Sequence, residues 1–289
     1  MKSASRVAPS PVVSLNQEVE PLGEAIQRMR RLHDERIIQT YRSPSRQDFN
    51  PTEKTQYLNI GYWKEGVKSL DEAAQSMAML VAATGQFSGD DIILDAGCGY
   101  GDAAILWMKR FRPRRIIGID INSDHAERAS HRAAELNMDG RLEFRVASAV
   151  EMPFEKASFD KVVSIEASHH FLTREDFFRE AFRVLKPGGR LVTTDVLPLP
   201  GRNVRLLGKT NAYPAHTYAE KLAGAGFSNV TVTSIRDCVF KPYSNFLLRS
   251  LSLSNVAGLF NILVHRFISS KLDYVLVTAD KGESRARQD

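Results

Sequence analysis

The 289-residue sequence predicts an α/β fold: a Rossmann-like, seven-stranded and mostly parallel sheet with helices on both faces. From Asp90 onward, short apolar runs alternate with amphipathic stretches, which is the pattern of βαβ units. A glycine-rich stretch, ILDAGCGYGDAA at residues 93–104, follows the first apolar run. Ligands of parallel sheets bind at the carboxyl ends of the strands, so this loop is the expected position of a site.

The apolar runs and the amphipathic stretches place each element of this fold in order. The seven expected strands span residues 91–96, 114–120, 141–148, 159–167, 190–196, 229–237 and 271–280. The expected helices among them span residues 102–111, 123–137, 173–185 and 216–226. The third of these helices should end at the KPGG run of residues 186–189, because proline and glycine stop a helix.

The N-terminal part is expected to consist of a tail and a helical cap. Residues 1–20, rich in Ser, Pro and Val, predict a disordered tail. Residues 24–41 suit a helix, and residues 69–85 suit a second one that Ser69 caps and Gly85 ends. Residues 21–85 should therefore cover a cofactor-binding domain that spans residues 86–289.

Composition limits the class of protein. A formal net charge of +5 is modest, so a nucleic-acid partner is not expected. The two cysteines exclude a disulfide framework and a cysteine-rich metal site, and no cluster of acids suggests a metal. Neither a signal peptide nor an apolar run of membrane-spanning length is evident, so a cytoplasmic protein without a transmembrane segment is expected.

The glycine loop predicts a ligand without phosphate. A dinucleotide fingerprint needs its third glycine at position 102, which holds Asp102. We expect Asp102 to cap the following helix, where its charge would compete with a pyrophosphate. Asp120 ends the second strand, where an acid meets a ribose diol in such folds, although it would equally serve as a helix cap beside Asn122.

Four separated motifs carry a resemblance to a known family. They are ILDAGCGYGD, IGID, EMPFEKASFDKVVSIEASHHF and EAFRVLKPGGRLVTTD. In order and spacing they resemble the class I S-adenosylmethionine-dependent methyltransferases, over roughly residues 55–280. The upstream YLNIGYWKEG and the Glu-x-x-His-His pattern are similar to the sugar and macrolide O-methyltransferases of natural-product pathways.

The resemblance implies S-adenosylmethionine as cofactor and assigns residues to it. It implies Asp95, Gly97, Gly99 and Gly101 around the methionine and ribose, Asp120 on the ribose hydroxyls, Ile121 against the adenine, Ser148 and Ala149 at the adenine edge, and Tyr57 at the cofactor carboxylate. Ser148 departs from the family pattern, which has aspartate there. Tyr62 and Trp63 either form an aromatic lid or only pack.

Methyl transfer to a hydroxyl requires loss of a proton, for which histidine is suited near neutral pH. The resemblance implies His169, His170 and Asp195 as catalytic candidates, with Glu166 facing the same pocket. Alternatively, the histidines only shape the turn, and Glu166 holds substrate, balances the sulfonium or acts as a base in carbon methylation. The remaining histidines are expected to be packing or surface residues: His33, His125, His131, His216 and His265.

The resulting prediction is methyl transfer to a hydroxyl of a hydrophobic small molecule, such as a secondary metabolite. The alternatives are methylation of an isoprenoid or aromatic carbon, and a non-catalytic cofactor-binding subunit. Residues 243–270 hold more apolar residues than one buried stripe needs. We expect either a helix packed on the sheet edge or on a second subunit of a homo-oligomer, a lid over the acceptor, or a membrane-surface helix.

Overall fold

The structure is a computed structural model that describes residues 22–42, 54–202, 212–250 and 256–283. The expected tail at residues 1–20 lies outside these ranges. One sheet holds the strands β1 (Ile92–Ala96), β2 (Arg115–Asp120), β3 (Leu142–Val146), β4 (Phe159–Ile165), β5 (Leu185–Pro198), β6 (Ser228–Ser234) and β7 (Leu272–Asp280).

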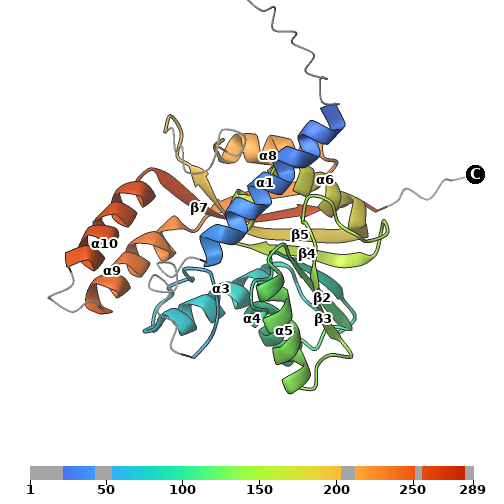
Figure 1. Cartoon of the computed structure of the whole chain (residues 1–289), viewed down its shortest axis with the longest axis horizontal. Coiled ribbons are helices and arrows are strands. Elements are labelled where there is room, and N and C mark those ends of the chain that lie inside the picture. The colour runs from blue at the N-terminus through green and yellow to red at the C-terminus, as the bar shows by residue number, and fades with distance from the viewer. Residues whose placement is uncertain (1–21, 43–53, 203–211, 251–255, 284–289) are drawn as a thin grey trace, which may run out of the picture.

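The strand order is β3-β2-β1-β4-β5-β7-β6 (Figure 1). β7 is antiparallel to both of its neighbours, and the remaining neighbours pair in parallel. The mostly parallel, Rossmann-like fold expected from the sequence is confirmed. The chain turns from one half of the sheet to the other between β1 and β4, which is where ligands of such sheets bind.

Helices cover both faces of the sheet. One face packs against α3 (Leu70–Thr84), α4 (Asp102–Arg110) and α5 (Ser123–Glu135), and the other against α6 (Arg174–Val184) and α8 (Ala215–Gly224). Trp107 of α4 is fully buried, and its indole N–H donates to the Ala78 carbonyl at 2.9 Å. This bond joins α3 to α4, so α3 belongs to the core of the domain.

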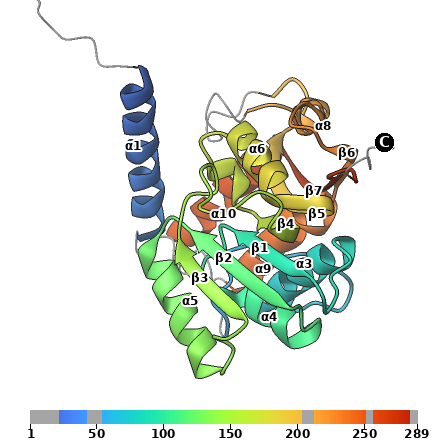
Figure 2. The ribbon, with the colours of Figure 1, turned by 90° about the vertical axis from the view of Figure 1, so that its right-hand side faces the viewer.

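The expected cap over residues 21–85 is therefore divided. The helix α1 (Leu22–Arg42) stands along one side of the body, as Figure 2 shows, whereas α3 is buried against the sheet. The reason is the sequence of α3, whose buried residues are apolar, with Met77, Val81 and several alanines, apart from Asp71 in its first turn. Ser69 caps α3 by accepting from the Glu72 N–H, as expected, and Gly85 ends it.

One helix begins differently from the expectation. Gly101, with a φ of +79°, precedes α4, and no side chain caps this helix. Asp102 is not the cap: its carboxylate instead forms a two-pronged ion pair with Arg132 of α5, at 2.6 and 2.9 Å. Arg132 also donates to the Tyr100 carbonyl, so this pair fixes the glycine loop against α5.

Two antiparallel helices form the C-terminal layer before β7. They are α9 (Phe240–Ser250) and α10 (Val256–Ser269), with residues 251–255 outside the described part. Buried Tyr243 and Leu247 of α9 pack with Ile262 of α10 and with Leu70. No helix in the described ranges is long and apolar enough to cross a membrane.

Candidate active site

An open cavity lies between α1 and the carboxyl ends of β1 to β4. All of the expected cofactor-binding residues line it except Gly101: Tyr57, Asp95, Gly97, Gly99, Asp120, Ile121, Ser148 and Ala149. Of the expected catalytic residues, Glu166 and His170 line it, whereas His169 and Asp195 do not. The topology has thus gathered most of the predicted site at one edge of the sheet.

The glycine loop runs close to the segment after β4. A Cβ atom on Gly97, which has a φ of +79°, would lie 2.4 Å from the Ala167 Cβ, so only glycine fits there. The N–H groups of Gly97 and Cys98 both donate to the Ile119 carbonyl of β2. Gly101 faces away from the cavity, and the Phe144 ring, 2.5 Å from a Cβ at that position, accounts for its glycine.

Asp120 closes the loop from the end of β2. Its carboxylate accepts from the N–H of Gly99 at 3.0 Å and from the N–H of Asn122 at 2.9 Å. Asn122, not Asp120, caps α5 by accepting from the Asp124 N–H. Because each carboxylate oxygen accepts more than one hydrogen bond, Asp120 retains capacity for a diol in the cavity.

Asp95 is the most deeply buried carboxylate that lines the cavity. Burial, and secondarily the charge of Asp120, raises the pKa of Asp95 to about 7. One of its carboxylate oxygens has no hydrogen-bond partner within the described part of the chain. Such a buried acid is suited to a positively charged ligand group, which would satisfy its charge.

These features fit S-adenosylmethionine, which carries a ribose diol and positive charges on its sulfur and its ammonium group. Asp120 offers oxygens for the diol, and Asp95 offers a buried carboxylate. Tyr57 and Ser148 also line the cavity, at positions compatible with the expected contacts. The Tyr57 hydroxyl donates to the Asp102 carbonyl at 3.3 Å, and burial together with the Asp102 charge raises its pKa.

The two histidines after β4 differ in position. They lie in the short helix η1 (Ser168–His170), with ring centres 4.0 Å apart, and only His170 reaches the cavity lining. His169 Nδ1 instead lies 3.5 Å from Asp195 of β5. The sequence did not distinguish the two rings, because adjacent residues in a turn give no sign of which one faces the ligand.

Asp195 is fully buried behind the histidines. It accepts from the Ser168 hydroxyl at 2.6 Å and pairs with the Arg174 guanidinium at 2.8 Å. Burial alone would raise the pKa of Asp195, but Arg174 and His169 together outweigh it and hold this pKa well below its usual range. Asp195 is thus an ionised group that orients η1 from outside the cavity.

Glu166 lines the cavity at the end of β4 with a left-handed φ of +55°, a conformation that costs energy for a non-glycine residue. Its Oε2 accepts from the Ile60 N–H at 2.9 Å and from the Tyr274 hydroxyl at 3.0 Å. Glu166 therefore joins the segment before α3 to β7 while facing the cavity. These bonds give it a structural role in addition to any role toward a ligand.

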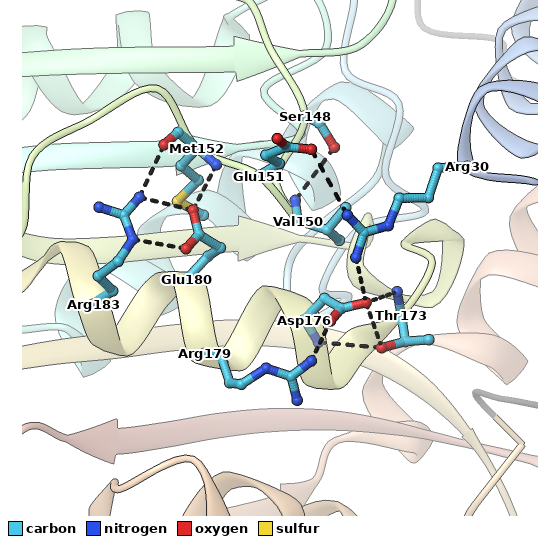
Figure 3. A network of polar contacts seen from close by, with 10 residues as sticks. All are labelled: Arg30, Ser148, Val150, Glu151, Met152, Thr173, Asp176, Arg179, Glu180 and Arg183. Atoms are coloured by element: carbon cyan, nitrogen blue, oxygen red, sulfur yellow. Dashed lines mark hydrogen bonds and ion pairs between the residues drawn. The ribbon is translucent and has the colours of Figure 1, made fainter. Parts of the chain in front are cut away.

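The helix α1 supplies the wall opposite the strand ends, through Asp34, Ile37, Ile38 and Tyr41. Figure 3 shows the polar network that holds it: Arg30 contacts Asp176 at 3.3 Å and Glu151 at 3.7 Å. The same network ties the segment after β3 to α6, since Glu180 accepts from the Met152 N–H at 2.6 Å.

Several lining residues were not among those expected from the sequence. His125, expected to be a packing or surface residue, lines the cavity and places Nδ1 3.4 Å from Asp120 Oδ1. His33 of α1, also expected to be ordinary, contacts the His170 carbonyl through Nε2 at 2.7 Å. The only available signal for His125 was its place in the first turn of the helix after Asp120.

Two expected lid elements lie outside the cavity lining. Trp63 packs on Phe246 of α9, with ring centres 5.1 Å apart, and its indole N–H donates to the Ile60 carbonyl. Tyr62 packs in the cluster around Met77 and Tyr274. None of the described residues of α9 or α10 contributes to the lining, whereas residues of α1 do.

Comparisons with known proteins agree with this geometry. A family described as a methyltransferase domain matches residues 94–193. Erythromycin 3''-O-methyltransferase of Saccharopolyspora erythraea is 37% identical over 264 residues, covering 81% of this chain and 86% of that protein. The 27-O-demethylrifamycin SV methyltransferase of Amycolatopsis mediterranei is 33% identical, covering 78% of this chain and 90% of that protein.

A solved structure shares the fold. It is geranyl diphosphate C-methyltransferase of Streptomyces coelicolor, in complex with Mg²⁺, geranyl-S-thiolodiphosphate and S-adenosyl-L-homocysteine. The TM-score is 0.70 at 22% identity, covering 86% of this chain and 98% of that chain. Within the described residues of the present chain, no group of three or more His, Cys, Asp or Glu side chains could hold a metal ion.

Proposed function

The chain belongs to the S-adenosylmethionine-dependent methyltransferases, and from this premise we propose that it methylates a hydroxyl group of an uncharged, hydrophobic natural product, with His170 as the base. The observation that carries the proposal is the composition of the cavity lining. His170 lines the cavity together with apolar side chains such as Ile38 of α1 and Phe171, which directly follows η1. The relatives named above as acting on erythromycin and on a rifamycin support an acceptor of this kind.

Charge further defines the acceptor. Five carboxylates line the cavity, from Asp34, Asp95, Asp102, Asp120 and Glu166, and among the described lining residues there is no lysine or arginine. With Asp102 already paired to Arg132, a diphosphate or carboxylate acceptor would find no lysine or arginine in the described part of the lining to bind it. The lining therefore favours an uncharged acceptor over one that resembles geranyl diphosphate.

The residues divide the work of the reaction between them. Bound S-adenosylmethionine supplies an electrophilic methyl group on a sulfonium sulfur. His170 accepts the proton that the hydroxyl loses, and the walls of the cavity hold the hydroxyl in line with the methyl group. His169, oriented by ionised Asp195, acts as a positioning residue that keeps the adjacent His170 ring in place.

Carbon methylation remains the second candidate because of Glu166, whose carboxylate faces the cavity. A carboxylate there would stabilise positive charge that develops on an alkene or aromatic acceptor. Its two hydrogen bonds from Ile60 and Tyr274 orient it, which suits either reaction. A cytoplasmic location and the absence of a nucleic-acid partner remain parts of the proposal.

The test compares three matched macrolide glycosides with the full-length enzyme and S-adenosylmethionine. The first carries a free sugar hydroxyl, the second lacks that hydroxyl, and the third carries a phosphate ester in its place. We expect only the first to gain a methyl group, seen by mass spectrometry and located on oxygen by NMR. Methylation of the deoxy compound at a carbon atom would overturn O-methylation. Efficient methylation of the phosphate ester, at one of its remaining hydroxyls, would overturn the preference for an uncharged acceptor.

A further inference from the structure

The outer face of α10 is an apolar surface that the domain core does not use. Five side chains form it, and we call it the α10 face: Leu259, Phe260, Leu263, Val264 and Phe267. Phe260 and Phe267 are 66% and 64% exposed, which is unusual for such large apolar side chains. At about 100° per residue, the five side chains fall within one arc of about 140° around the helix axis.

The opposite side of α10 is fully engaged. Ile262 is buried against Leu70, Tyr243 and Leu247, and Ser244 contacts His265 Nδ1 at 3.1 Å. In Figure 1, α10 is the outer helix of the α9–α10 pair, beside β7 and away from α5. The exposure of the α10 face is therefore a consequence of how the helix is packed, with one apolar side inside and a second one outside.

The stretch of sequence that contains this face carries charge of one sign. Between residues 238 and 272 the sequence contains no Asp or Glu, whereas it contains Lys241, Arg249, Arg266 and Lys271. The Lys271 ammonium lies 4.0 Å from the centre of the Phe267 ring, so a cation borders the apolar surface directly. Asp237 and Asp273 flank this stretch, and Asp273 is engaged with the Ser234 hydroxyl and the Tyr274 N–H.

We infer that the α10 face docks α10 lengthwise on an anionic lipid surface. Aromatic and aliphatic side chains on one side of a helix, bordered by basic residues, are the pattern of interfacial helices. Anionic headgroups complement the basic residues of the acid-free stretch, of which Lys271 borders the face directly. A second copy of the chain is disfavoured, because pairing α10 with α10 would bring basic residues together without an acid from the same stretch.

This inference does not rest on the proposed function, because it uses no residue of the cavity. It has a consequence for that function all the same. Hydrophobic small molecules partition into membranes, so an enzyme held at the lipid surface would meet its acceptor where the acceptor concentrates. The α10 helix, with 14 residues and a basic edge, lies on such a surface and does not span it.

The experiment measures sedimentation of the full-length protein with vesicles. One set contains phosphatidylcholine alone and the other contains about one third phosphatidylglycerol, an anionic lipid. We expect binding to the anionic vesicles that weakens with salt. A Phe260→Ser/Phe267→Ser variant should bind at least about tenfold more weakly, because it loses two aromatic side chains that would insert into the lipid.

The matched control is Leu136→Ser/Val146→Ser, which removes two exposed apolar side chains elsewhere. This variant should bind vesicles like the wild type, and circular dichroism should show that both variants are folded. Absence of vesicle binding, or equal binding to both vesicle types, would overturn the inference. So would a wild-type dimer in analytical ultracentrifugation that the Phe260→Ser/Phe267→Ser variant abolishes, because the face would then join two copies.

Discussion

The cavity has two walls that the protein holds in different ways. The strand-end wall, formed by Asp95, Gly97, Gly99 and Asp120, consists of backbone that is bonded within the sheet, such as the Gly97 N–H on the Ile119 carbonyl at 2.8 Å. The α1 wall instead depends on a few side-chain contacts of one helix. Its Arg30 contacts Glu151, whose side chain is 77% exposed, and surface pairs of this kind contribute about 0–1 kcal/mol.

The difference separates the wall that binds the cofactor, which is the same for every enzyme of this kind, from the wall that meets the acceptor, which is not. A cofactor of fixed shape suits a wall of buried strand ends, which has one well-packed arrangement. Acceptors differ between enzymes. Because α1 is held by a few polar contacts, its sequence and position can change without disturbing the sheet. Substitutions in the strand-end wall should therefore affect cofactor affinity, and substitutions in the α1 wall should affect the acceptor.

The largest expected effect belongs to His170, which lies where the two walls meet. Replacing His170 with Ala removes the proposed base, so kcat should fall by about 10²–10⁴-fold. The affinity for S-adenosylmethionine, measured by calorimetry, should stay near that of the wild type. Added imidazole should restore part of the rate, which a merely structural role would not permit.

The neighbouring ring provides the matched control. His169→Ala should reduce kcat by only about tenfold, because His169 acts by positioning and lies outside the cavity lining. A larger loss for His169→Ala than for His170→Ala would reverse the roles assigned here. Loss of cofactor binding in His170→Ala would assign this residue to the strand-end wall.

The next effect concerns the acid at the end of β2. Asp120→Ala should weaken S-adenosylmethionine binding by about 1.5–3 kcal/mol, since a charge-assisted contact with the ribose diol is lost. Asp120→Asn should fall between this variant and the wild type, because it keeps an oxygen that accepts from the Gly99 N–H. Calorimetry with S-adenosylhomocysteine should give the same ranking. Unchanged affinity in both variants would contradict the assignment.

A smaller effect follows from the raised pKa of Asp95. Binding of a cation favours the ionised carboxylate, so cofactor affinity should rise with pH up to about 7, where Asp95 loses its proton. Above that pH, Asp95 should cause no further rise in affinity. The rise should be at most about tenfold per pH unit. Because the cofactor's own ammonium also titrates, Asp95→Asn is the reference. Titrations at about pH 6 and 8 should show a steeper dependence for the wild type, and equal slopes would contradict the prediction.

The sequence predicted the two walls unequally, for physical reasons. The strand-end wall follows from local patterns: an apolar run, glycines at alternate positions, and an acid at the next strand end. The α1 wall depends on where a helix with weak contacts settles, and the periodicity of residues 24–41 does not specify its partner. Likewise, no local pattern separates His169 from His170, because the Asp195 pairing that turns one ring away comes from a distant strand.

The smallest expected effect tests the α1 wall itself. Arg30 lies one turn before Asp34 and joins α1 to Asp176 of α6 and to Glu151, so Arg30→Ala should let the wall loosen without unfolding the domain. The acceptor KM should rise by about 2–5-fold, in keeping with surface pairs of at most about 1 kcal/mol, and cofactor affinity should not change. Arg31→Ala, which removes the same charge from an exposed neighbouring position, should leave both quantities unchanged. If Arg30→Ala weakens cofactor binding as much as acceptor binding, the two walls act as one unit, and the division between them does not hold.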